Sequence, residues 1–295
     1  MTEPETGNDA LRRVLNSEGY GFQSAILKKC INETNWHDGV DEFPVELHDS
    51  AVHVDFILGY HTDLLVAECK RVDGWTWAFA RGNSATSGSW GARPVVDYLA
   101  KVTAVDSPLR GQIQQQPRSL AALGGSPYNV SVEMKARHKT VGDQPAKARP
   151  RSLDSAVTQV LRARGGLLSL IAKRNAADHI AGAVVPVIFT TATLLVTEVD
   201  LSDADLADGR LASVEAKAVD ALWFNYRLPK LLRPEIPIAL GQNQGYYSSN
   251  IARLQRSIDR EMSRSIGIVR PEGVTAFLNS LGEAVAHGGQ EVAPW

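Results

Sequence analysis

Three charged residues interrupt two apolar segments of the chain, and their spacing would let them act together. Asp55 lies in the apolar run 53–58, and Glu68 and Lys70 lie in the run 64–70. Because side chains alternate along a β-strand, Glu68 and Lys70 would share one face of a strand. If a tight turn joins the two runs as an antiparallel hairpin, Asp55 comes opposite or diagonal to Glu68, with Cβ atoms roughly 5 to 8 Å apart. The sequence therefore predicts two carboxylates and an ammonium group at one place.

A pair of carboxylates at this spacing suits a divalent cation that prefers oxygen ligands. Mg²⁺ keeps several water molecules and tolerates a site with few protein ligands, and Mn²⁺ is expected to substitute for it. In the hydrolysis of a phosphodiester, the cation would polarise a phosphoryl oxygen and lower the pKa of a bound water. We therefore predict Asp55 and Glu68 as metal ligands, with Lys70 positioning the water or offsetting the developing negative charge. The alternative is an ordinary salt bridge between Lys70 and one of the two carboxylates on an exposed sheet face.

The elements that must position these residues follow from hydrophobic spacing. Apolar residues at helical spacing predict two short N-terminal helices, in 10–15 and 22–31. Short β-branched or apolar runs then predict a three-stranded meander over 43–47, 52–58 and 64–72. The second and third strands of this meander form the hairpin that carries the charged residues.

Further regular elements follow a long irregular stretch. Residues 152–173 have strong helical periodicity, and Ser152 is placed to cap the helix. The runs 184–189 and 193–199 are typical of buried strands, joined by a tight Thr-rich turn. The predicted order of elements in this part of the chain is therefore α, β, β, β, α, β, β.

The chain resembles the PD-(D/E)XK, or restriction-endonuclease-like, superfamily in its motif, Asp55 followed by Glu68-Cys69-Lys70, and in this order of elements. The resemblance covers residues 18–199. The resemblance implies an α/β fold, in which a central mixed β-sheet has the catalytic hairpin at its middle and helices on both faces. It also implies a role for Cys69, because in that family the residue between Glu and Lys often binds the metal through its backbone carbonyl. The implied metal ligands are therefore Asp55, Glu68 and Cys69.

Members of the superfamily often carry a Glu or Gln on the first core helix near the metal. The resemblance assigns Gln23 to this place, as a further catalytic residue. A glutamine adds no charge at the metal, so its task would be a hydrogen bond to a ligand or a water. Glu18 and Glu46 are alternatives for the same supporting role. The family also commonly carries a Gln on the crossover helix, for which Gln159 is the candidate.

The domain prediction is one nuclease core with additions. We expect a core over 1–199 that contains an insertion at about 73–151, and a C-terminal extension, 200–295, that packs on the core. Alternating aromatic residues at the start of the insertion favour a half-buried strand over a base-stacking surface: Trp75, Trp77 and Phe79.

The net charge provides no bulk positive field for a polyanionic partner. Lys and Arg number 31 against 33 Asp and Glu, which gives a formal net charge of -2, so a nucleic-acid surface must be local. A predicted helix over 248–265 carries an arginine stripe that could follow a phosphate backbone, although a solvated face is favoured; its members are Arg253, Arg256, Arg260 and Arg264. A loose basic segment over 135–151 has the same two interpretations.

Several other classes of protein are disfavoured. The sequence has no Walker-type phosphate loop, dinucleotide fingerprint or serine-hydrolase elbow, and its 7 histidines show no zinc-binding spacing. Cys30 and Cys69 lie in apolar runs, where buried free thiols are the common outcome. No signal peptide or membrane-spanning run is evident. A soluble protein in the reducing cytoplasm is therefore expected.

Together these patterns predict a Mg²⁺-dependent nuclease that hydrolyses phosphodiester bonds, with DNA as the expected substrate. Restriction or anti-phage defence is the usual biology of such chains, by analogy alone. Many of these nucleases cut both strands as homodimers, so a second copy is an implied partner. The alternative function is a nucleic-acid-binding or assembly module of the same fold that does not cleave.

Overall fold

The computed structural model describes residues 15, 19–48, 50–81, 93–101, 113–120, 126–135, 152–173, 182–232 and 263–287 of the 295-residue chain. Eight strands in this part of the chain form the main sheet, which follows the order β1 (His37–Leu47), β2 (Ser50–Tyr60), β3 (Asp63–Lys70), β8 (Gly182–Thr190), β12 (Ser263–Val269) and β11 (Ala221–Arg227). The other two, β5 (Val95–Lys101) and β6 (Ile113–Ser119), pair with each other, and β5 also pairs with β8. β3, β8 and β12 run parallel, whereas β1, β2 and β11 are antiparallel to their neighbours. The prediction of an α/β fold with a mixed sheet is confirmed.

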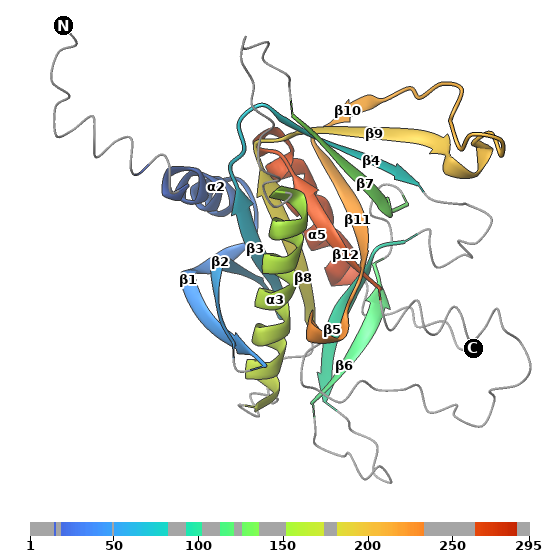
Figure 1. The fold of residues 1–295 in the computed structure, drawn as a ribbon. Helices are drawn as coiled ribbons and strands as arrows, with labels where there is room; N and C mark the ends of the chain where they lie inside the picture. Colours follow the sequence, from blue (N-terminus) through green and yellow to red (C-terminus); the bar gives the residue numbers. More distant parts are fainter. Residues whose placement is uncertain are drawn as a thin grey trace, which may run out of the picture.

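A smaller sheet lies beyond one end of the main sheet (Figure 1). Its four described strands follow the order β10 (Lys217–Val219), β9 (Thr193–Asp200), β4 (Trp75–Arg81) and β7 (Val130–Lys135). β4 follows β3 in the chain, and β9 follows β8, after short connections. Lys70 and Thr190 are the last paired residues of β3 and β8. The end of the main sheet that carries Lys70 therefore adjoins the small sheet.

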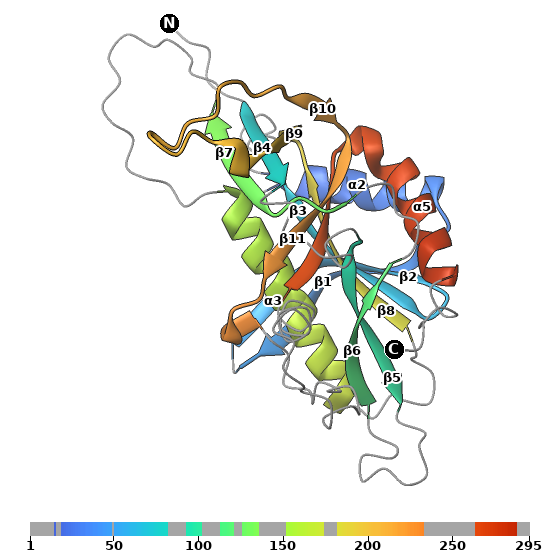
Figure 2. The ribbon, with the colours of Figure 1, turned by 90° about the vertical axis from the view of Figure 1, so that its right-hand side faces the viewer.

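Helices cover both faces of the main sheet (Figures 1 and 2). α3 (Ser152–Lys173) lies across one face and contacts β1, β2, β3 and β8. α2 (Tyr20–Glu33) and α5 (Val274–His287) lie together on the opposite face. The bounds of α3 are those that the sequence predicts, and this helix is the crossover between the parallel strands β3 and β8. Three 3-10 turns complete the described elements: η2 (Leu201–Asp203), η3 (Lys230–Leu232) and η5 (Pro271–Gly273).

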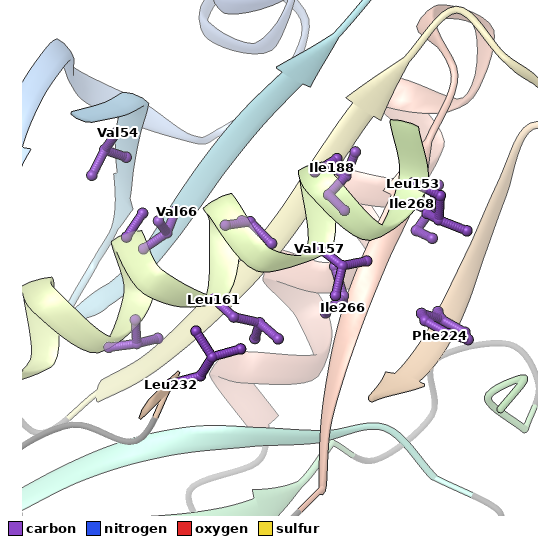
Figure 3. Close-up of a cluster of buried hydrophobic side chains, with 14 of the residues drawn as sticks. Val54, Val66, Leu153, Val157, Leu161, Ile188, Phe224, Leu232, Ile266 and Ile268 are labelled. Carbon is purple, nitrogen blue, oxygen red and sulfur yellow. The ribbon is translucent and has the colours of Figure 1, made fainter. Parts of the chain in front are cut away.

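Buried apolar side chains form one layer on each side of the main sheet. In the layer under α3, Val157 and Leu161 face the strands (Figure 3), together with Val54, Val66, Ile188, Ile266 and Ile268 from the sheet. The layer under α2 and α5 contains Ile26 and Leu278 from those helices, with Phe56, Ala67, Val187 and Phe189 from the sheet. Burial of these two layers is the main favourable contribution to folding.

Alternation along β3 decides which way its charged residues point. Val66 belongs to the layer under α3, whereas Ala67 and Cys69 pack in the layer under α2 and α5. Glu68 and Lys70 continue the alternation of Val66, so they lie on the α3 face.

Two adjacent glycines let α3 lie close to β1. A Cβ atom added at Gly166 would lie 2.7 Å from Cγ2 of Val45 and 3.0 Å from the backbone oxygen of Glu46. One added at Gly165 would lie 3.0 Å from Cδ2 of Leu47. Because interiors are close-packed, larger residues here would push the helix away from the strand. The glycine pair therefore helps to fix β1 on the rest of the sheet.

The stretch expected as an irregular insertion, 73–151, is more regular than its composition indicates. Its described residues include β4, β5, β6 and β7, and β5 belongs to the main sheet. Trp77 and Phe79 are buried in β4, at 0% and 1% exposure. The strand interpretation of these aromatic residues is thereby confirmed, and neither of these two rings is available to stack on a base.

The segment 200–295, expected as an extension of the core, supplies β11, β12 and α5 to the main sheet and its cover. The predicted helix over 248–265 is wrong at its described end, because residues 263–265 begin β12. Arg264 is 1% exposed and ion-paired with Asp97, so it is not part of an exposed arginine stripe. The other members of that stripe lie outside the described residues, as do 10–14 and 136–151.

Both cysteines are free, as expected; Cys30 is buried and Cys69 is partly buried. Burial raises the pKa of the Cys30 thiol to about 12, so this thiol stays protonated and unreactive. None of the helices in the described part of the chain has the length and apolar character that crossing a membrane requires.

Candidate functional site

Asp55 and the Glu68-Cys69-Lys70 segment meet where β2 and β3 begin to separate. The last recorded pair of the β2–β3 ladder is Phe56 with Ala67, and one further step in this register sets Asp55 opposite Glu68. At this point the backbone N–H of Cys69 donates a hydrogen bond of 2.6 Å to Oδ2 of Asp55. The Asp55 carboxylate thus accepts the hydrogen bond that a backbone carbonyl of β2 would accept in a regular ladder. This bond holds Asp55 beside Glu68 and Lys70 of β3.

Asp55 occupies the position where β2 changes the layer that it faces. Val54 packs in the layer under α3, and Phe56 packs in the layer under α2 and α5. Burial raises the pKa of Asp55, the N–H of Cys69 partly offsets this, and the charge of Glu42 raises the pKa further. Asp55 is therefore held in a setting that disfavours its negative charge unless a cation is near.

Glu68 is the most buried of the predicted site residues, with only 5% of its surface exposed. Among the described residues, it has no hydrogen-bond or ion-pair partner. Burial, followed by the neighbouring charge of Asp55, raises the pKa of Glu68 to about 8, although Lys70 acts in the opposite direction. A buried carboxylate without a partner is costly to ionise, so this position favours a bound cation.

Lys70 is half-buried and is oriented by the crossover helix. Its Nζ donates to Oε1 of Gln159, at 3.5 Å, and the hydroxyl of Ser155 donates to the same oxygen at 3.3 Å. Gln159, the candidate on the crossover helix, thus contacts the ammonium group rather than either carboxylate. Because this contact is long, the ammonium group still has N–H donors for a ligand that binds at the site.

Gln23 contacts the site from α2. Its Nε2 donates to the backbone oxygen of Asp55 at 2.8 Å and to Oε1 of Glu42 at 2.9 Å. The glutamine therefore supports two strands and adds no charge of its own. Glu46 lies at the opposite end of β1, paired with Ala51, and Glu18 is outside the described residues.

Glu42 is a site residue that the sequence did not reveal. The pairs Asp41 with Phe56 and Phe43 with Val54 place Glu42 across β1 and β2 from Asp55. It was missed because the polar, Gly-containing run before Phe43 does not resemble a strand, whereas β1 begins at His37. Its φ of 47° lies in the left-handed region, which is costly for a residue with a Cβ atom.

The backbone carbonyl of Cys69 points toward the same side as Asp55. The N–H of Thr191 donates to the carbonyl of Lys70 at 3.4 Å, so the Lys70 carbonyl points toward β8 and its continuation. Successive carbonyls of a strand point in opposite directions, and the N–H and C=O of one residue point the same way. Because the Cys69 N–H reaches Asp55 on β2, the Cys69 carbonyl is directed to that side as well.

The chemistry of these donors fits a hard divalent cation such as Mg²⁺. Asp55 and Glu68 supply carboxylate oxygens, Cys69 supplies a carbonyl oxygen, and Glu68 lacks any other partner among the described residues. Within the described residues, no three or more His, Cys, Asp or Glu side chains are arranged to hold a metal ion. The protein's ligands would therefore be two side chains and one carbonyl, with water or substrate completing the coordination.

The raised pKa of Glu68 predicts an unusual dependence of stability on pH. The folded protein keeps this proton up to about pH 8, whereas the unfolded chain releases it near the usual value of 4.5. Between these values the folded state binds more protons, so the free energy of unfolding contributed by Glu68 falls as pH rises. In EDTA, we expect Tm to drop by at least about 2 to 4 °C from pH 5.5 to pH 8, and Mg²⁺ to restore it.

Differential scanning fluorimetry at several pH values, with EDTA or with Mg²⁺, measures this effect. The difference in Tm between the two conditions should widen toward pH 8, because only the ionised carboxylates attract the cation. A difference that is zero or constant over this range would contradict the assignment of Glu68.

No family model matches the sequence, and neither a curated protein nor a solved structure matches the chain. The functional conclusion therefore depends on the residues of the site and their geometry.

Proposed function

We propose that the chain is a metal-dependent nuclease with a restriction-endonuclease-like core, which hydrolyses phosphodiester bonds of DNA. The observation that carries the proposal is the hydrogen bond from the Cys69 N–H to Oδ2 of Asp55. This bond joins the two strands beside Glu68, a buried carboxylate without a described partner, and beside the ammonium group of Lys70. An ordinary salt bridge does not account for the site, since neither Asp55 nor Glu68 forms an ion pair with Lys70 within 4.0 Å among the described residues.

Each residue of the site has a task in this function. Asp55 and Glu68 would hold Mg²⁺ with the carbonyl of Cys69, and Mn²⁺ would substitute for it. When bound, the ion supplies Lewis-acid polarisation of a phosphoryl oxygen and a lowered pKa of a bound water. Lys70, steadied by Gln159, would donate a hydrogen bond to the attacking water or to the phosphate. Its positive charge offsets negative charge that develops during hydrolysis.

The resemblance to the PD-(D/E)XK superfamily supports DNA as the substrate and restriction or anti-phage defence as the setting. It also supports a homodimer as the acting form, and the two free cysteines support a reducing cytoplasm as the location. The near-neutral net charge of -2 means that DNA must be bound by a local surface rather than by the charge of the whole protein.

The role of Lys70 provides a direct test. Lys70→Met keeps most of the side-chain volume and removes the ammonium group, so we expect DNA cleavage in Mg²⁺ to fall by roughly 10²- to 10³-fold. Cleavage of supercoiled plasmid and of single-stranded DNA, followed on gels, measures this loss. Lys28→Met is the matched control, because Lys28 is an exposed lysine of α2.

The outcomes of this test separate the two candidate functions. Undiminished cleavage by Lys70→Met, or no cleavage of any DNA by the wild-type protein in Mg²⁺ or Mn²⁺, would contradict the proposal. A gel shift of DNA without cleavage would instead favour a binding module that does not cleave.

A further inference from the structure

Glu42 carries an inference about how the cation is held. We propose that Glu42 is a third carboxylate of the cation site, which accepts a hydrogen bond from a water molecule on the ion, and that Gln23 is its positioning residue. The inference rests on the cation site of the proposed function; it adds Glu42 to that site and gives Gln23 the task of positioning it. Both come from elements outside the hairpin: Glu42 from β1 and Gln23 from α2.

The backbone places Glu42 next to Asp55. The pairs Asp41 with Phe56 and Phe43 with Val54 enclose it on β1, so it faces Asp55 across the β1–β2 ladder. The same antiparallel register, continued on the other side of β2, sets Asp55 opposite Glu68. Three residues with carboxylate side chains thus occupy neighbouring positions on three adjacent strands.

Gln23 ties Glu42 to the site through both donors of its amide. One N–H of Nε2 reaches the backbone oxygen of Asp55 at 2.8 Å, and the other reaches Oε1 of Glu42 at 2.9 Å. Among the described residues, this amide is the hydrogen-bond partner of the Glu42 side chain. Oε2 of Glu42 therefore stays available to accept a hydrogen bond from a water.

The charges of the cluster match a divalent cation. Glu42 lies near enough to Asp55 and Glu68 for its negative charge to act on both carboxyl groups. When Glu68 is ionised, the three carboxylates and the ammonium group of Lys70 sum to two negative charges. A separate observation also indicates a positively charged ligand at this site: Glu68 is only 5% exposed and has no described partner.

A contact through water suits Glu42 better than a direct bond to the ion. Its side chain is exposed, whereas Glu68 is buried and Asp55 half-buried. In the part of the chain that the structure describes, the three carboxylates do not converge as direct ligands of one ion. Mg²⁺ retains several of its bound water molecules in proteins, and carboxylates that accept hydrogen bonds from these waters strengthen the binding of the ion.

The test is the affinity of the full chain for Mn²⁺, measured by isothermal titration calorimetry. Glu42→Gln removes the charge, and we expect the dissociation constant to rise by about 10-fold or more. Glu46→Gln is the matched control, since Glu46 is an exposed glutamate at the other end of the same strand, and it should bind like the wild type. Gln23→Ala should weaken binding less, and the double variant Gln23→Ala/Glu42→Gln should bind no worse than Glu42→Gln alone.

A second variant separates binding from folding. The φ of 47° at Glu42 suits glycine, so Glu42→Gly should leave Tm in EDTA unchanged or raised while it weakens Mn²⁺ binding as Glu42→Gln does. A purely structural glutamate would give the opposite pattern, with lower Tm and intact affinity. If the wild type binds Mn²⁺ and both Glu42 variants bind it equally well, this inference alone is overturned. If the wild type binds no Mn²⁺, the cation site and the proposed function fail together.

Discussion

Glu68→Gln should abolish DNA cleavage and, at the same time, stabilise the protein in EDTA at pH 8. The carboxylate of Glu68 is almost fully buried beside Asp55, with no described partner, so ionising it without a cation is unfavourable. Glutamine has nearly the same shape and no charge, which removes this cost and also removes a proposed metal ligand. We expect cleavage in Mg²⁺ to fall by at least about 10³-fold and Tm in EDTA to rise by roughly 2 to 4 °C.

Opposite changes in activity and stability distinguish a functional carboxylate from a structural one. Plasmid cleavage and scanning fluorimetry on the same preparation measure the two effects, and Glu46→Gln, which removes an exposed charge, should change neither. In Mg²⁺ the order of stability should reverse, because only the wild type gains from binding the cation. A Glu68→Gln protein that is less stable than the wild type in EDTA, or that still cleaves DNA, would refute this assignment.

Asp97→Asn is expected to give the largest loss of stability. Asp97 of β5 is fully buried, and its carboxylate accepts hydrogen bonds from Nε of Arg164 on α3 and from Nε of Arg264 on β12, the latter at 2.6 Å. Gln115 of β6 donates to it as well. Burial alone would raise the pKa of Asp97, but the two guanidinium groups hold it at about 2.

Removing this one negative charge takes the Asp97 carboxylate partner away from two buried guanidinium groups. Such a change typically costs about 3 to 5 kcal/mol, which corresponds to a Tm lower by roughly 6 to 20 °C. Chemical denaturation and scanning fluorimetry measure the loss. Asp73→Asn is the control, since Asp73 is exposed and lies 3.6 Å from the exposed Arg71, where an ion pair contributes little. A loss below about 1 kcal/mol for Asp97→Asn would show that the cluster does not hold α3 on the sheet.

The hairpin and the crossover helix could be predicted because their signals are local. Asp55 and Glu68 stand out against apolar neighbours, and the period of two along β3 separates Lys70 from Cys69 without knowledge of the partner strands. The periodicity of α3 runs through 22 residues, which is long enough to fix both ends. These are the parts of the fold in which sequence neighbours are also structural neighbours.

The remaining features depend on contacts between distant segments. β12 belongs beside β8, with Gly267 paired to Val187, but nothing near Gly267 in the sequence indicates this pairing. Arg264 appeared to belong to a helical stripe because its spacing was taken alone, whereas its position is set by Asp97, which is 167 residues away. Glu42 was missed for a related reason: it becomes a neighbour of Asp55 only through the pairing of β1 with β2.

Cleavage of DNA by the purified protein, with Mg²⁺ added to and then removed from the same reaction, tests the central claim most directly. Wild-type protein should cut in Mg²⁺, stop when EDTA is added and resume when Mg²⁺ is restored in excess. Asp55→Asn should give no more cleavage than the EDTA reaction, because it loses a charged ligand while its amide oxygen can still accept from the Cys69 N–H. Cleavage that continues in EDTA, or that Asp55→Asn performs at the wild-type rate, would contradict the account.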